Sequence, residues 1–202
     1  MTIGILNYGM GNLSSIKNAL DFLGEKNKIV DDYKDIKKFD GLILPGVGAY
    51  PEAVKNLKKK NFISELDEFV FNKKKNILGI CLGMQLILST STEKTFTDGL
   101  NYIKGDVKFL NFKNISVPHV GWSQINILKR NSLLKKIDKE SYFYFDHSYY
   151  FYDNLKKNID AELNYGRKIS AIISKDNIFG VQFHPEKSQT SGLTLLNNFV
   201  KL

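Results

Sequence analysis

The sequence has little of what builds disulfides, metal sites or membrane spans. Among its 202 residues there is one cysteine, Cys81, so no internal disulfide can form. The three histidines include no pair at metal-ligand spacing, and we expect no metal site. No apolar run approaches the ~20 residues that a membrane span needs, and no basic leader precedes the first apolar stretch. We therefore expect a cytoplasmic protein with no membrane contact.

Basic residues outnumber acidic ones, 29 to 21, which gives a net charge of +8. Such a surplus permits attraction to nucleic acid. The lysines, however, form short runs such as Lys58-Lys59-Lys60 and Lys73-Lys74-Lys75 at the ends of expected helices, where they complement the helix dipole. There is no arginine-rich tract and no RNA-binding aromatic motif. We interpret the lysines as solvated surface and expect no nucleic-acid partner.

The first half of the chain alternates expected strands with expected helices. The expected strands are residues 2–7, 27–30, 41–44 and 76–80, and the expected helices are residues 13–23, 51–59, 63–72 and 82–89. Strands separated by helices pair in parallel through right-handed crossovers. Functional side chains then gather where the strands end and the helices begin.

After residue 100 the pattern changes to short strands with short turns. We expect strands at residues 107–112, 123–128, 142–145, 171–174 and 178–183, then a closing helix at residues 191–201. The predicted fold class is therefore α/β: a single domain spanning residues 1–202, with an open, mostly parallel sheet of the flavodoxin or Rossmann kind flanked by helices. Its C-terminal part is expected to be antiparallel.

Cys81 lies at the centre of Gly79-Ile80-Cys81-Leu82-Gly83, between an expected strand and an expected helix. Small residues two before and two after a nucleophile describe a nucleophile elbow, because the turn is sharp and the flanking backbone packs closely. The helix dipole at this position favours a thiolate. A free cysteine is often only a small buried hydrophobe. The flanking glycines favour the interpretation of Cys81 as a nucleophile over that of a buried hydrophobic residue.

A cysteine nucleophile needs a base and a group that orients the base. His184 follows an apolar strand in Gly180-Val181-Gln182-Phe183-His184-Pro185-Glu186, and the strand order would return it to the sheet edge of Cys81. Residues two apart in an extended segment point the same way, so Glu186 is the expected orienter. His119 and His147 lack such a neighbour, and we expect structural roles for them.

Pro45-Gly46-Val47-Gly48 follows the third expected strand. Its glycines leave the peptides free to turn an amide N–H toward a ligand, so the Val47 turn could supply one oxyanion donor and the Leu82 amide another. The alternative is an ordinary glycine-rich turn.

The segment Gly9-Met10-Gly11-Asn12, with Asp31 and Asp32 about twenty residues later, is a weak match to a dinucleotide-binding fingerprint. Ser14 stands where the third glycine of that fingerprint would be, which argues against this interpretation.

Taken together, these motifs resemble the class I (triad) glutamine amidotransferases, through residues 79–85 and 180–186. Within that family the chain is similar to the subgroup that forms the glutamine amidotransferase subunit of imidazole glycerol phosphate synthase, in histidine biosynthesis. The features of this subgroup are Asn7-Tyr8-Gly9-Met10-Gly11-Asn12-Leu13, Leu44-Pro45-Gly46-Val47-Gly48, Pro118-His119-Val120-Gly121-Trp122, Phe145 with His147-Ser148-Tyr149, and Lys187-Ser188.

The resemblance implies a role for each matching residue. Cys81 is the nucleophile, His184 the base and then acid, and Glu186 its orienter. The oxyanion donors are the amides of Val47 and Leu82. The residues expected to hold glutamine are Gly48, Gln85, Glu93, Ser148 and Tyr149, and those expected to face a partner are Asn12, Trp122, Tyr144 and Lys187.

By the same resemblance, the chain hydrolyses L-glutamine without a cofactor and passes ammonia to a TIM-barrel cyclase subunit within a heterodimer. Departures from the family pattern at Val120, Ser123 and Asp146 leave open a different synthase, such as one that amidinates a surface sugar. A non-catalytic module on a decayed amidotransferase scaffold is a further alternative, and the complete set of Cys81, His184 and Glu186 argues against it.

Overall fold

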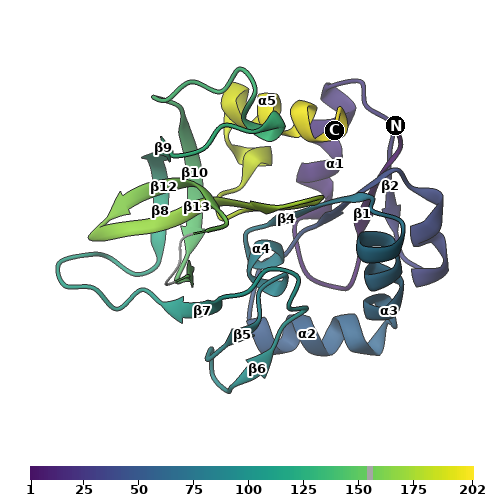
Figure 1. Cartoon of the computed structure of the whole chain (residues 1–202), viewed down its shortest axis with the longest axis horizontal. Helices are drawn as coiled ribbons and strands as arrows, with labels where there is room; N and C mark the ends of the chain where they lie inside the picture. Colours follow the sequence, from purple (N-terminus) through teal and green to yellow (C-terminus); the bar gives the residue numbers. More distant parts are fainter. Residues whose placement is uncertain (154–156) are drawn as a thin grey trace.

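The computed structural model describes residues 1–153 and 157–202 and centres on a mixed eight-stranded sheet (Figure 1). Its strands, in spatial order, are β2 (Asn27–Val30), β1 (Ile3–Leu6), β3 (Gly41–Leu44), β4 (Asn76–Ile80), β14 (Ile178–Val181), β13 (Arg167–Lys175), β12 (Ile159–Tyr165) and β9 (Asn126–Ile127). The first five are parallel and the last three join them antiparallel. The predicted mostly parallel sheet with an antiparallel C-terminal part is confirmed.

Helices cover both faces of the sheet (Figure 1). On one face lie α1 (Leu13–Phe22) and α5 (Gln189–Val200), and on the other lie α2 (Tyr50–Lys59), α3 (Phe62–Asp67) and α4 (Leu82–Leu86). Alternate strand residues supply the two cores, because successive side chains of a strand point to opposite faces. Ile3 and Ile5 pack with α1 and α5, whereas Leu6 packs with α2 and α3.

Two smaller sheets extend from the main one. In the first, β8 (His119–Gln124) pairs antiparallel with β10 (Tyr142–His147). The second contains β11 (Tyr149–Tyr152), β7 (Asp106–Phe109), β5 (Thr90–Ser91) and β6 (Thr97–Asp98). Single 3-10 turns or short 3-10 helices occur at Tyr33–Lys38, Ser132–Leu134 and Pro185–Lys187. The turn from β10 to β11 passes close to the end of β4, and this is where the candidate site lies.

Several element boundaries differ from the prediction. The expected helix at residues 63–72 is α3 followed by a π-helical turn, Glu68–Asn72. The expected helix at residues 82–89 ends at Leu86. The expected strand at residues 123–128 is interrupted at Ile125, a buried residue that separates β8 from β9.

The strands β11 and β12 were not predicted. In β12 two acidic residues, Asp160 and Glu162, are buried, so its hydrophobic pattern does not identify a core strand. Asp160 is held by hydrogen bonds from the Asn131 amide (2.8 Å) and the Ser174 hydroxyl (2.5 Å). Its partners come from distant segments, which local sequence does not reveal.

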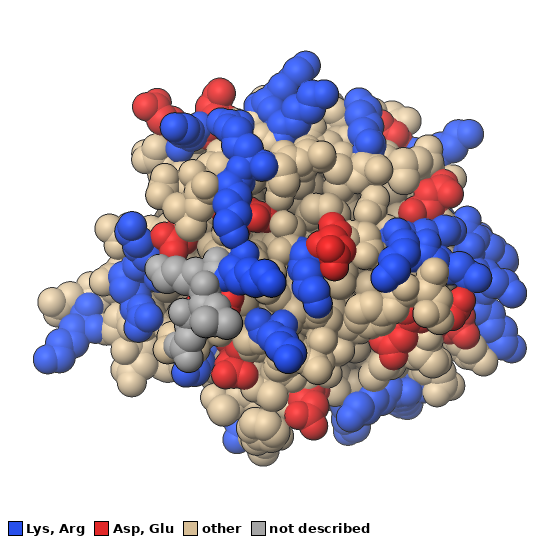
Figure 2. Space-filling view, viewed as in Figure 1, with Lys and Arg blue, Asp and Glu red and all other residues tan. Residues whose placement is uncertain are grey.

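Charge on the surface is dispersed. Figure 2 shows lysine and arginine side chains spread across this face with carboxylates between them. None of the helices in the described residues is long and apolar enough to cross a bilayer; the longest, α5, has 12 residues.

Candidate active site

Two neighbouring parallel strands bring Cys81 and His184 to the same edge of the sheet. The strands β4 and β14 pair with Ile80 opposite Val181, and Cys81 directly follows β4. The Cys81 N–H donates to the Val181 carbonyl at 2.8 Å, which continues the ladder by one residue. Residues far apart in the chain therefore converge, as expected where the carboxyl ends of parallel strands meet.

The backbone at Cys81 turns sharply between β4 and α4, with φ +52° and ψ −109°. A positive φ is uncommon for a residue with a side chain and occurs where the surroundings enforce it. The flanking glycines make the turn possible: a β-carbon at Gly83 would lie 1.8 Å from the Leu44 carbonyl oxygen, and one at Gly79 2.6 Å from the Gly83 carbonyl oxygen. The local geometry is that of a nucleophile elbow.

His184 and Glu186 form a buried pair next to Cys81. The His184 Nδ1–H donates to Glu186 Oε1 at 2.8 Å, and both side chains are almost fully buried. The prediction placed both residues on one extended segment. Only His184 is extended, and Glu186 lies in the 3-10 turn Pro185–Lys187, so a tight turn makes the contact. Because the Nδ1 proton is bonded to Glu186, Nε2 is the ring nitrogen that can exchange a proton during the reaction.

Opposing effects determine the protonation of His184. Burial lowers the pKa of its imidazole, but hydrogen bonding and the negative charges of Cys81 and Glu186 outweigh burial and raise that pKa to about 10. The His184 imidazole is therefore favoured in its protonated form at neutral pH. Within the described residues, His184 Nε2 has no hydrogen-bond partner, so this atom is available to exchange a proton.

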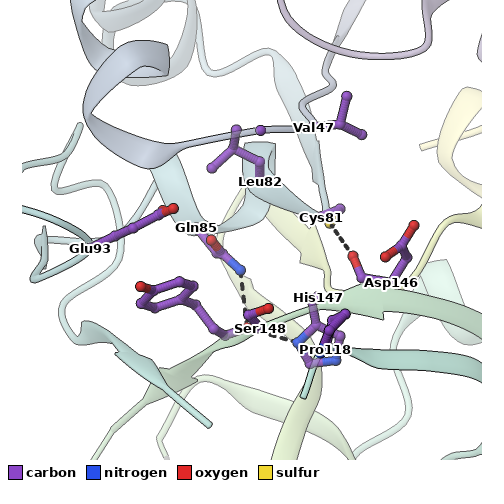
Figure 3. Close-up of a pocket in the computed structure, with 11 residues that line it drawn as sticks. Val47, Cys81, Leu82, Gln85, Glu93, Pro118, Asp146, His147 and Ser148 are labelled. Carbon is purple, nitrogen blue, oxygen red and sulfur yellow. Dashed lines mark hydrogen bonds between the residues drawn. The ribbon is translucent and has the colours of Figure 1, made fainter. Parts of the chain in front are cut away.

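The sulfur of Cys81 has two polar neighbours. Its Sγ lies 3.7 Å from the carbonyl oxygen of Asp146, which accepts from the thiol (Figure 3), and 3.7 Å from the side-chain Nε2 of Gln182, which donates to it.

A cavity of about 350 Å³ opens over Cys81 (Figure 3). It brings together eight of the residues predicted for catalysis and glutamine binding: Val47, Gly48, Cys81, Leu82, Gln85, Glu93, Ser148 and Tyr149. Pro118, Asp146 and His147 line it as well and were not predicted to do so. The predicted pair of His184 and Glu186 is buried beside this cavity.

Glu93 reaches the cavity from the loop after β5 (Figure 3). Its Oε2 accepts a hydrogen bond from the Tyr50 N–H at 2.9 Å, at the start of α2. The start of a helix attracts negative charge, so this contact holds the Glu93 side chain in place at the cavity. Burial, together with the charge of Glu93, raises the pKa of the phenol of Tyr149, which also lines the cavity. An anchored carboxylate at the cavity wall suits a ligand ammonium.

The predicted oxyanion donors, Val47 and Leu82, also line the cavity. Leu82 is the first residue of α4, where N–H groups have no partner inside the helix. Val47 is 44% exposed and follows a turn that packs against Leu82. The Tyr8 hydroxyl donates to the Pro45 carbonyl at 2.6 Å and so holds the start of this turn.

His119 and His147 form a neutral buried pair. His147 Nδ1–H donates to the Tyr149 carbonyl at 2.7 Å, and the facing nitrogens of the two rings are 3.1 Å apart. His119 Nε2 lies 2.9 Å from the Ser123 hydroxyl. Burial lowers the pKa of His119 to about 4 and that of His147 to about 3. Neutral rings locked between β8 and β10 suit the structural role expected for them.

Three of the four residues predicted to face a partner gather at one place. The ring of Trp122 meets the ring of Tyr144 edge-on at 6.1 Å, and Lys187 Nζ lies 5.5 Å from the centre of the Tyr144 ring. Trp122 is half-exposed. Asn12 lies elsewhere, where its side chain caps α1 by accepting from the Ser15 N–H at 3.2 Å.

The acidic residues of the dinucleotide alternative are engaged locally. Asp31 accepts from the Asn7 side chain at 2.7 Å, and Asp32 accepts from the Lys34 N–H at 2.9 Å. In the described parts of the chain, no group of three or more His, Cys, Asp or Glu residues is arranged to hold a metal ion.

Comparison with known proteins identifies the family. The model of the family described as "Glutamine amidotransferase class-I" matches residues 5–202. The chain belongs to the class I glutamine amidotransferases.

Two relatives of this amidotransferase are named as subunits of one enzyme. The "Imidazole glycerol phosphate synthase subunit HisH 1" of Campylobacter jejuni (strain RM1221) is 48% identical over 202 residues, covering 99% of this chain and 100% of the relative. The "Imidazole glycerol phosphate synthase subunit HisH" of Caldanaerobacter subterraneus subsp. tengcongensis is 48% identical over 197 residues, covering 98% and 96%. A solved "glutamine amidotransferase" has the same fold, with a TM-score of 0.79 at 18% identity, covering 98% and 97%.

One residue of this amidotransferase site had no role in the sequence interpretation. Gln182 belongs to the motif that contains His184, yet its contact with the Cys81 sulfur was not predicted. A signal was present: Gln182 is a polar residue inside an apolar run and lies two residues before His184, on the same side of an extended segment.

Proposed function

We propose that the chain hydrolyses L-glutamine to glutamate and ammonia, with Cys81 as nucleophile, His184 as general base and acid, and Glu186 as the residue that orients His184. The observation that carries the proposal is the buried His184–Glu186 pair beside Cys81 at the ends of adjacent strands. The raised pKa of His184 supports an ion pair with the thiolate before substrate binds.

The reaction proceeds in two halves. The Cys81 thiolate attacks the side-chain amide carbon of glutamine, and the amides of Val47 and Leu82 hold the oxyanion. His184 gives its Nε2 proton to the amide nitrogen, the C–N bond breaks, and ammonia leaves a glutamyl thioester. His184 then takes a proton from water, and the resulting hydroxide attacks the thioester carbon. The C–S bond breaks, which releases glutamate and restores the thiolate.

The cavity residues divide the recognition of glutamine. The Glu93 carboxylate pairs with the α-ammonium, since it is anchored and faces the cavity. Gln85 contributes its side-chain oxygen, because its amide nitrogen donates to protein acceptors. Gly48, Ser148 and Tyr149 complete the walls.

The chain acts as the glutaminase subunit of imidazole glycerol phosphate synthase in histidine biosynthesis, and the names of the 48% identical relatives support this assignment. Its partner is the TIM-barrel cyclase subunit in a heterodimer, which receives ammonia directly, before solvent can protonate it. We place the docking surface at Trp122, Tyr144 and Lys187, which lie together, and leave out Asn12, which caps α1. The catalytic thiol must stay reduced, which suits the cytoplasm.

Replacing the nucleophile tests this function. Cys81→Ala, combined with the cyclase subunit, should abolish synthesis of imidazole glycerol phosphate from glutamine and leave synthesis from added ammonium salt at the wild-type rate. The ammonium arm is the internal control for folding and docking. Glutamine-dependent synthesis by the variant would refute the assignment of Cys81.

A different synthase partner stays a second candidate, because Val120 and Asp146 depart from the family pattern and are exposed on β8 and β10. Product analysis decides between the candidates. The wild-type chain is paired in turn with the cyclase and with a sugar-amidinating synthase, and the nitrogen of labelled glutamine is followed into product. Label in a sugar amidine and none in imidazole glycerol phosphate would overturn the assignment of the cyclase as partner.

A further inference from the structure

Gln182 is a fully buried amide in direct contact with the sulfur of Cys81. It directly follows β14, and its N–H donates to the Ala171 carbonyl at 2.9 Å, so its backbone is fixed by the sheet. A buried amide costs free energy unless its polar atoms are paired. The partners of Gln182 therefore show what its side chain does.

A hydrogen-bond network fixes the orientation of the Gln182 side chain. Gln85 Nε2 donates to the Tyr149 carbonyl at 3.1 Å and to Gln182 Oε1 at 3.2 Å. Because the Gln182 oxygen accepts from Gln85, its nitrogen is directed at the Cys81 sulfur, 3.7 Å away. The reverse orientation would place two N–H groups against each other.

The two polar neighbours of the sulfur favour different ionisation states. The Asp146 carbonyl can only accept, so it pairs with the thiol. The Gln182 amide donates, and a hydrogen bond to a charged acceptor is stronger than one to a neutral acceptor. Loss of the thiol proton therefore weakens the contact with Asp146 and strengthens the contact with Gln182.

We propose that Gln182 is a positioning residue that holds the Cys81 thiolate through an N–H···S hydrogen bond and connects it to Gln85 on the cavity wall. The proposal deepens the function proposed above and rests on it for the role of Gln85 in binding glutamine. Gln182 itself does not line the cavity, and it acts on the reaction through the sulfur. A ligand that moves Gln85 also moves the donor that stabilises the nucleophile.

The single cysteine makes a direct test possible, since every alkylated thiol is Cys81. The rate of carbamidomethylation by iodoacetamide, followed by intact mass across the pH range, reports the thiolate fraction. Gln182→Met preserves the length of the side chain and removes the donor. Gln124→Met, at an exposed glutamine of β8, is the matched control.

We expect the pH midpoint of Cys81 alkylation to rise by about one pH unit in Gln182→Met. This shift means about tenfold less thiolate at any pH below the midpoint. A change of this size corresponds to the loss of one hydrogen bond to a charged group. We expect kcat for glutamine to fall with little change in KM. Gln124→Met should match the wild type. An unchanged midpoint in folded Gln182→Met would overturn the proposal.

Gln85→Met provides a second route to the same question. It removes the donor that orients Gln182, so the proposal expects the midpoint of Cys81 alkylation to rise here too. The double variant should show less than the sum of the two single effects. If Gln182→Met does not fold, the midpoint of Gln85→Met decides, and a wild-type value would overturn the proposal. The alkylation assay needs no turnover. A wild-type protein that fails to hydrolyse glutamine would therefore refute the proposed function, whereas the proposed contact between Gln182 and the thiolate would still be tested by alkylation.

Discussion

Replacing Glu186 by glutamine would remove one charge from the centre of the site and keep its volume. The Glu186 side chain is 1% exposed, and its Oε1 accepts from His184 at 2.8 Å. Its other oxygen, Oε2, is buried with no hydrogen-bond partner in the described part of the chain. The carboxylate charge is therefore balanced mainly by the His184 imidazolium.

The expected effect follows from the pKa of His184. The rise from 6.5 to about 10 corresponds to about 5 kcal/mol of stabilisation of the imidazolium. Cys81 and Glu186 act in the same direction, and we assign the carboxylate about half of this. Losing about 2 to 3 kcal/mol should lower kcat for glutamine roughly 30- to 150-fold. KM should change little, because Glu186 contacts the base and lies outside the cavity.

The assay measures glutamate release in the complex with the liganded cyclase. Glu140→Gln, at an exposed glutamate, is the control for the change of charge. A kcat for Glu186→Gln within threefold of wild type would refute the role of Glu186 in orienting and charging His184.

The pKa of His184 also predicts how the stability of Glu186→Gln depends on pH. The pKa of His184 is raised in the folded state, so its contribution to the free energy of unfolding is complete below about pH 6.5 and is lost as the pH rises through about 10. Denaturant titrations should therefore show the largest gap in the free energy of unfolding between wild type and Glu186→Gln just below about pH 6.5. The gap should narrow toward pH 10, and a constant gap would contradict the reasoning.

Two further predictions concern the elbow and the buried histidine pair. Gly83→Ala places a β-carbon 1.8 Å from a carbonyl oxygen, so we expect misfolding or a loss above ~4 kcal/mol. Denaturant titrations should show that Gly24→Ala, in open space at φ +73°, costs only about 1–2 kcal/mol; equal losses would contradict the steric argument. His119 and His147 have lowered pKa values in the fold, so stability should fall as the pH drops from about 6.5 to about 4, by at most about 1.4 kcal/mol per pH unit for each histidine. The double variant with glutamine at both positions should show a shallower acid slope, and parallel curves would refute this.

The parallel half of the fold could be predicted from the sequence because its signals are local. Short apolar runs that alternate with periodic helical segments identify β1, β3 and β4 within a residue or two. The elbow at Cys81 is also local, since its glycines lie within two residues of the nucleophile. The glutamine-binding residues that line the cavity, in contrast, are named through the resemblance to a known family and not from a local pattern.

The antiparallel half could not be predicted to the same extent, because its strands and buried polar residues depend on contacts with residues far away in the sequence. The acidic residues of β12 are buried only because β13 and the segment around Asn131 satisfy Asp160. The contact of Gln182 with the sulfur likewise depends on the β4–β14 pairing, which brings two remote motifs together. Pro118 and Asp146 line the cavity through the pairing of β8 and β10, and no local pattern indicates that placement.

The pairing of β4 with β14 also bears on how such proteins diversify. Ladder hydrogen bonds between these strands fix the separation of the nucleophile and the base, although the two strands are far apart in the chain. Trp122 and Tyr144 lie on β8 and β10, which form a separate two-stranded sheet, so changes confined to that sheet leave the β4–β14 pairing in place. Evolution can therefore change how ammonia is delivered to a partner without changing the arrangement of the residues that release ammonia from glutamine.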